Sequence, residues 1–159
     1  MSGVRKPFDK KLFDESDPPA RQQVMQFLTK CGFNAWENRH QFGVDLVASK
    51  NGKTVHVEVE RRGSKHTPGK YSTINVPSRK DKFLGVEFAY ASLSQDMDTI
   101  AWLPADKVKV YFTDKYRIEN PNCYVREGEL FFSVPTSEWT IIKGLNQQLG
   151  ENGNVRNST

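Results

Sequence analysis

The chain of 159 residues is 36% hydrophobic and 11% aromatic and carries a net charge of +4, a composition that suits one folded domain with its own core. No stretch approaches the roughly 18 apolar residues of a membrane-spanning helix, and residues 1–11 lack the apolar centre of a signal peptide. We therefore expect a soluble, cytoplasmic protein without a membrane partner, with one domain over residues 1–149 and a flexible tail over residues 150–159.

The first predicted elements are a helix and three strands. A helix is expected over residues 18–31, with Asp17 as its N-cap and Pro18 in its first turn. Residues 33–37 are expected to form a strand. Asn51-Gly52 then separates two short apolar runs, which predicts a tight hairpin of antiparallel strands.

This hairpin carries three carboxylates. Asp45 interrupts the apolar run of the first strand, where an unpaired charge would be costly to bury. In the second strand three valines alternate with His56, Glu58 and Glu60, so the valines and the polar residues face opposite sides of the sheet. The acids would repel one another unless a divalent cation such as Mg²⁺ lay between them. The alternative is that Glu58 and Glu60 face solvent and pair with lysines of the same hairpin.

A basic segment follows the hairpin directly. Between residues 61 and 82, seven Lys and Arg residues stand against one acid, Asp81, whereas the rest of the chain is slightly acidic. Such a segment is suited to the phosphates of a polyanion, although a solvated loop is the alternative explanation. The candidate nucleic-acid-binding residues are Arg61, Arg62, Lys65, Lys70, Arg79, Lys80 and Lys82.

The second half of the chain is predicted to contain mostly strands. They are expected over residues 72–76, 86–93, 99–103 and 108–112, with a helical turn over residues 104–107. A second hairpin is expected around Glu127-Gly128-Glu129. A last helix is predicted after a cap at Thr136 or Ser137, because Trp139, Ile142, Leu145 and Leu149 keep helical spacing.

Asp45, followed after twelve residues by Glu58-Val59-Glu60 on the next strand, resembles the core motif of the PD-(D/E)XK nuclease superfamily. The resemblance covers about residues 18–110. It implies a restriction-endonuclease-like α/β (α+β) fold, with a central mixed sheet of about five strands flanked by helices. This chain would add a C-terminal hairpin and helix to that core. The resemblance also implies a Mg²⁺-dependent DNA endonuclease in which Mn²⁺ substitutes for Mg²⁺. Since both strands of a duplex need to be cut, we expect a homodimer.

The resemblance also implies roles for single residues. Asp45 and Glu58 would be metal ligands, together with the main-chain carbonyl of Val59. Glu60 stands where the family usually has Lys, and it would orient the attacking water. The candidate auxiliary residues are Gln22 or Gln23 from the first helix and His56 on the strand of the acids.

The Glu60 variant leaves other functions open. One is a nuclease fold that has lost catalysis and binds nucleic acid or a protein partner. Within the nuclease class, a Holliday-junction-resolvase-like enzyme, a restriction-like enzyme and a viral enzyme acting in the host cytoplasm all suit a small basic chain.

Overall fold

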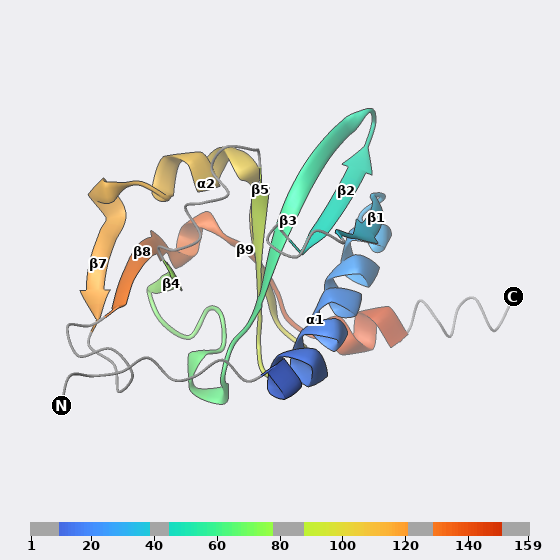
Figure 1. Cartoon of the computed structure of the whole chain (residues 1–159), viewed down its shortest axis with the longest axis horizontal. Helices are drawn as coiled ribbons and strands as arrows, with labels where there is room; N and C mark the ends of the chain where they lie inside the picture. The colour runs from blue at the N-terminus through green and yellow to red at the C-terminus, as the bar shows by residue number, and fades with distance from the viewer. Residues whose placement is uncertain (1–9, 39–44, 78–87, 121–128, 151–159) are drawn as a thin grey trace, which may run out of the picture.

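The computed structural model describes residues 10–38, 45–77, 88–120 and 129–150 (Figure 1). Among these residues, no helix is both long and apolar enough to cross a membrane. The longer elements are α1 (Lys10–Lys30), β1 (Asn34–Glu37), β2 (Leu46–Lys50), β3 (Lys53–Arg61), β4 (Thr73–Pro77), β5 (Phe88–Leu93), β6 (Ile100–Leu103), α2 (Ala105–Tyr111), β7 (Arg117–Asn120), β8 (Glu129–Pro135) and β9 (Thr140–Ile142). Short 3₁₀ helices lie at η1 (Ser64–His66), η3 (Asp114–Tyr116) and η4 (Thr136–Glu138).

The central sheet has six strands in the order β1-β2-β3-β5-β6-β9. Strands β3 and β5 run parallel, while the other neighbours in this sheet are antiparallel. The predicted mixed sheet is therefore confirmed, with six strands where about five were expected. A second, antiparallel sheet has the order β4-β8-β7.

The two faces of the central sheet are covered by different layers. Helix α1 packs on one face, where Val24 and Leu28 meet Leu46 and Val57 in one buried cluster. On the other face a second cluster is formed with residues of α2 and the small sheet. Figure 1 shows α1 on one side of β3 and β5 and the small sheet with α2 on the other. The central sheet is thus the middle of three layers, and each of its faces lies against a separate core.

The predicted hairpin is confirmed. Strands β2 and β3 pair from Leu46 opposite Val57 to Lys50 opposite Lys53. Asn51 and Gly52 form the turn with φ values of 54° and 78°. Positive φ at both turn residues matches the right-handed twist of the flanking strands, and Asn-Gly adopts it readily.

Helix α1 begins earlier than predicted. It starts at Lys10, so Pro18 and Pro19 lie inside it and Asp17 is not its N-cap. Proline lacks the N–H that would bond the carbonyl four residues back, but its fixed φ is compatible with a helix. The chain stays helical through the two prolines, and Ala20, directly after them, is buried.

The strand predicted over residues 108–112 is wrong, because residues 108–111 continue α2 and Phe112 is its C-cap. Val108 and Phe112 are both buried and lie four residues apart, which is helical spacing. Val110 between them is 54% exposed. In a strand it would share a face with Val108 and Phe112, so the alternating valines suggested the wrong period.

The C-terminal helix is shorter than predicted. Trp139 follows the 3₁₀ turn η4, and the next three residues form β9, which pairs with β6. Only residues 145–150 are helical. Gly144, with φ of 75°, separates strand from helix in a conformation that other residues rarely adopt.

Several predictions fall outside the described residues. These are the binding candidates Arg79, Lys80 and Lys82, the Glu127-Gly128 part of the second hairpin and the tail from residue 151. Strand β7, which pairs with β8, was not predicted from the sequence.

The helical conformation of residues 108–111, with Phe112 as C-cap, predicts unequal effects of two truncations. Phe112→Ala should lower the free energy of unfolding by about 3–5 kcal/mol, because Phe112 is buried and stacks on Phe132. Val110→Ala should change it by less than about 0.5 kcal/mol, because Val110 is largely exposed. Urea unfolding measures both, and a large loss for Val110→Ala would contradict the helix.

Candidate functional site

Asp45 directly precedes β2, and the pairing of β2 with β3 positions it. Val47 lies directly opposite His56 in the β2–β3 pairing, so Asp45, two residues earlier, comes opposite Glu58 on the same face. The main-chain N–H of Val59 donates a hydrogen bond of 2.9 Å to Oδ2 of Asp45. Asp45 therefore lies beside β3, just beyond the last paired residue of β2, Leu46.

Glu58 is a buried carboxylate in the middle of β3. Its exposed fraction is 4%, and it lies in register with Tyr90 on the parallel strand β5. Val57 and Val59, on either side, belong to the layer covered by α1. The predicted alternation is thus confirmed: the valines face α1, and Glu58 points to the other face of the sheet.

The carbonyl of Val59 is oriented toward Asp45. Within a strand, the N–H and C=O of one residue point to the same neighbouring strand. Since the Val59 N–H donates to Asp45, the Val59 carbonyl points to the same side of β3, where β2 no longer pairs with it. Two carboxylates and one main-chain carbonyl therefore lie together.

Glu60 lies beside Tyr90 and Arg62. Its Oε2 accepts a hydrogen bond from the hydroxyl of Tyr90 and lies 3.8 Å from Nη2 of Arg62. Burial raises the pKa of Tyr90 well above its usual range, and the negative charge of Glu60 raises that pKa further. The Tyr90 hydroxyl therefore stays protonated and donates to Glu60.

The donors fit a hard divalent ion only in part. Within the described ranges, no group of three or more His, Cys, Asp and Glu side chains is arranged to hold a metal ion. However, Mg²⁺ often takes one or two carboxylates and completes its shell with water and substrate phosphate oxygens. Asp45, Glu58 and the Val59 carbonyl match that smaller donor set.

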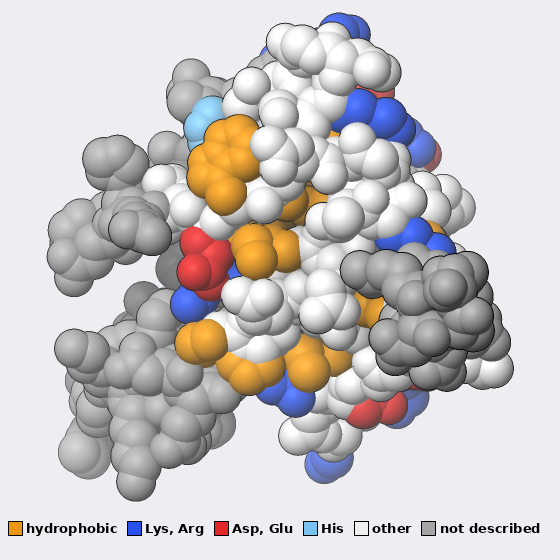
Figure 2. Space-filling model, turned by 90° about the vertical axis from the view of Figure 1, so that its right-hand side faces the viewer, with side chains coloured by type: hydrophobic (Ala, Val, Ile, Leu, Met, Phe, Trp, Pro, Cys, Tyr) orange, Lys and Arg blue, Asp and Glu red, His pale blue; other side chains and the backbone are white. Residues whose placement is uncertain are grey.

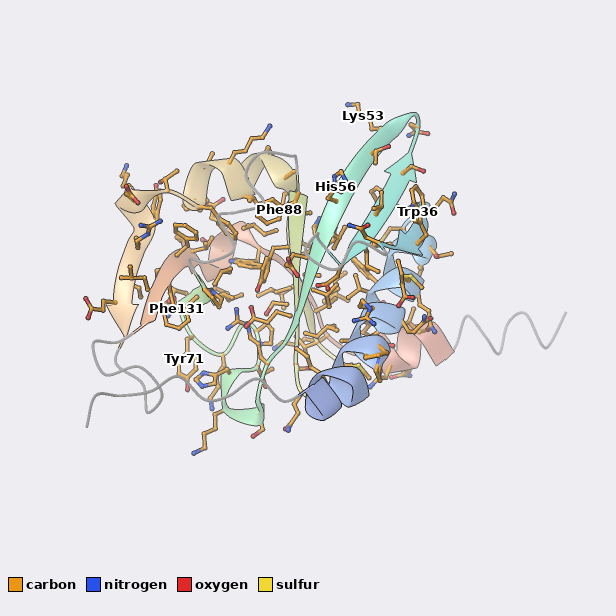
Figure 3. The ribbon with its side chains drawn as sticks, in the orientation of Figure 1. Trp36, Lys53, His56, Tyr71, Phe88 and Phe131 are labelled. Carbon is orange, nitrogen blue, oxygen red and sulfur yellow. The ribbon has the colours of Figure 1, made fainter. Side chains whose placement is uncertain are left out.

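His56 lies on the face of the acids, one position closer to the hairpin turn. It is half-buried and in register with Phe88 of β5. Figure 3 shows the two side chains next to each other on neighbouring strands. Its predicted contact with a phosphate remains a prediction.

The basic residues fall into three groups. Arg61 donates to the carbonyl of Gln95 at 2.8 Å, and Arg62 is only 12% exposed and bonds internal partners. Lys65 and Lys70 are exposed on the loop between β3 and β4. Arg79, Lys80 and Lys82 lie outside the described residues. Within the part of the basic segment that the structure describes, the loop lysines are thus the better placed cations for a polyanion.

The two candidate glutamines of α1 are not brought to the acids. The amide of Gln23 donates to the Met97 carbonyl at 3.0 Å and to Oδ1 of Asn146 at 2.7 Å. Gln22 lines a pocket of about 430 Å³ between α1, β1 and Leu149. Both belong to the layer on the valine face of the sheet. Figure 2 shows this side of the molecule, where hydrophobic side chains reach the surface among charged ones.

Sequence reasoning missed Tyr90, Ser92 and Asn75 as neighbours of the acids. The Oγ of Ser92 accepts a hydrogen bond from Nε of Arg62, and the Asn75 carbonyl accepts one of 2.6 Å from Nη2 of Arg62. A signal was present, because Tyr90 and Ser92 are polar groups at alternate positions of an otherwise apolar strand. Their partners could not be predicted without the order of the strands in the sheet, because those partners lie far away in sequence.

Comparisons with known proteins identify similar folds. No family model and no curated protein matches the sequence. Among solved structures, the chain is similar to Archaeoglobus fulgidus Hjc, a Holliday junction resolvase from an archaeal hyperthermophile, at 14% identity and a TM-score of 0.43, over 76% of this chain and 84% of that one. It is also similar to the bacterial homing endonuclease I-Ssp6803I at 18% identity and a TM-score of 0.44, over 60% of this chain and 67% of that one. Both similarities concern the fold and assign no role to any residue.

The buried phenol predicts a loss of stability in alkali. The folded protein keeps the Tyr90 proton because the pKa of Tyr90 is raised, whereas the unfolded chain releases it near pH 10. The free energy of unfolding should therefore fall as the pH rises above about 10, since the unfolded state then binds fewer protons. Tyr90→Phe should remove part of that fall. Urea unfolding between about pH 9 and 11 measures the slopes, and Tyr71→Phe, at an exposed site, is the control. Equal slopes in wild type and Tyr90→Phe would contradict the assignment.

Proposed function

We propose that the chain is a Mg²⁺-dependent endonuclease that hydrolyses phosphodiester bonds of DNA at Asp45 and Glu58. The observation that supports this most is the placement of Asp45 opposite the buried Glu58, with the Val59 N–H bonded to Asp45. Burying a carboxylate beside a second one is unfavourable unless a cation compensates the charge. An ion bound there would offset that cost.

Each residue would contribute differently. A bound Mg²⁺ or Mn²⁺ would polarise the phosphodiester and acidify a water molecule. Asp45, Glu58 and the carbonyl of Val59 would hold the ion, and the hydrogen bond from Val59 would keep Asp45 in place. Glu60 would orient the attacking water and accept its proton, which is the role that the PD-(D/E)XK resemblance gives to this position.

The loop after β3 would hold the DNA. Lys65 and Lys70 are exposed on it, and Nζ of Lys70 lies 5.5 Å from the centre of the Tyr71 ring. Figure 3 shows Tyr71 on the opposite side of the molecule from Trp36. Lysines beside an exposed aromatic ring suit a nucleic-acid backbone. Cutting both strands requires two sites, which we propose a homodimer supplies.

Cleavage should require both acids and a divalent ion. Asp45→Asn and Glu58→Gln should each lower kcat by about 10³-fold, because each removes a ligand charge that acts on the transition state. Glu37→Gln, at an exposed ion pair with Arg21, should leave it unchanged. The assay follows labelled linear duplex, single-stranded and four-way-junction DNA with Mg²⁺ or Mn²⁺, and excess EDTA should stop the reaction.

A second candidate function is a nuclease fold without catalysis that binds nucleic acid. It is favoured by Glu60, because this carboxylate is already tied to Tyr90 and Arg62. Uncut DNA under every condition, together with binding that does not change with Mg²⁺, would support it over the nuclease. If Asp45→Asn cleaves DNA as fast as the wild type, the cleavage does not depend on the Asp45 carboxylate.

The loop lysines should carry salt-dependent binding. Replacing both Lys65 and Lys70 by Gln should reduce the slope of log K against log salt by about 2, because each phosphate contact adds about 1. Lys30→Gln, at the exposed end of α1, should leave the slope unchanged. Fluorescence anisotropy with labelled duplex at several salt concentrations measures it in Ca²⁺ or EDTA, and an unchanged slope in the double variant would remove this loop from the interface.

A further inference from the structure

Glu60 is held by two neighbours on one face of the central sheet. Both the Tyr90 hydroxyl and Nη2 of Arg62 approach the same oxygen, Oε2. The other oxygen, Oε1, is then the one that can face a water molecule, and the Glu60 side chain is 26% exposed. Tyr90 is completely buried, so its hydroxyl cannot leave Glu60 unless the surrounding core repacks.

Arg62 is fixed from two further directions. Its Nε donates to Ser92 of β5, and its Nη2 donates to the Asn75 carbonyl of β4. The guanidinium therefore joins the central sheet to the small sheet beside Glu60. Because guanidinium is planar and always charged, several hydrogen bonds at once make it a fixed positive charge.

This arrangement distinguishes Glu60 from the other two acids. Arg62 lies beside Glu60 and offsets its negative charge. Asp45 and Glu58 lie opposite each other on the two strands of the hairpin. One divalent ion can take those two carboxylates, whereas a third carboxylate that was free to join would hold the ion more tightly or attract a second one.

We propose that Tyr90 and Arg62 are positioning residues that keep Glu60 out of the metal coordination, so that Asp45, Glu58 and Val59 hold a single ion and Glu60 faces the water. This inference rests on the proposed function. Tyr90 and Arg62 act only through Glu60 and touch neither the ion nor the substrate.

Metal binding and turnover should change in opposite directions when this support is removed. In Tyr90→Phe and Arg62→Gln, Glu60 is free to join the ion, so Mn²⁺ should bind about tenfold tighter or at a second site per chain. At the same time kcat should fall by about 100-fold, the size of a lost general base, with KM for DNA unchanged. Calorimetric titration with Mn²⁺ and steady-state cleavage measure the two effects.

The matched control is Tyr111→Phe. Tyr111 donates its hydroxyl to Glu138 beside Lys107, so this variant removes a similar hydrogen bond that involves none of Asp45, Glu58 and Glu60. It should leave Mn²⁺ binding and kcat unchanged. Arg62→Lys, which keeps the positive charge, should retain a single ion per chain.

The outcomes separate the inference from the proposed function. Wild-type Mn²⁺ affinity and kcat in Tyr90→Phe would overturn the positioning role while leaving the nuclease intact. A parallel loss of Mn²⁺ binding, kcat and melting temperature would also overturn it, because Tyr90 would then support only the fold. If the wild-type chain binds no Mn²⁺, the proposed function fails and this inference fails with it.

Discussion

The candidate site depends on one hydrogen bond, from the main-chain N–H of Val59 to the side chain of Asp45. Strand β2 pairs with β3 only as far as Leu46 opposite Val57. Beyond that point the side of β3 that faced β2 has lost its regular partner, and the Asp45 carboxylate accepts the hydrogen bond there. An acid that completes a strand ladder is held in position by the neighbouring strand, and it lies on the side of β3 to which the Val59 carbonyl also points.

The alternation of β3 then decides what surrounds the acids. Because successive side chains point to opposite faces, the valines pack under α1 while Glu58 and Glu60 enter the layer between the two sheets. Carboxylates in that layer need compensation. Glu60 obtains it from Tyr90 and Arg62, and an ion held by Asp45 and Glu58, as we propose, would bring positive charge to the other two acids. The same residues thus link the packing of the two sheets to the charge of the site.

Local signals in the sequence were sufficient for the hairpin and the opposition of the two acids. Asn51-Gly52 fixes the register of β2 and β3, and register fixes which side chains meet. Local signals failed where two periods were both possible: Val108 and Phe112 fit a strand at steps of two and a helix at a step of four. They also could not reveal that Arg62 lies inside the protein, because its partners Asn75 and Ser92 come from strands distant in sequence.

The most direct test is a crystal structure of the wild-type protein soaked in Mn²⁺, with anomalous diffraction used to locate the ion. We expect a single anomalous peak bounded by Asp45, Glu58 and the carbonyl of Val59. We also expect that Glu60 still accepts the hydrogen bond from Tyr90. A peak that includes Glu60 as a ligand would contradict the positioning of Glu60. Full-occupancy Mn²⁺ elsewhere, with none at Asp45 and Glu58, would contradict the site itself.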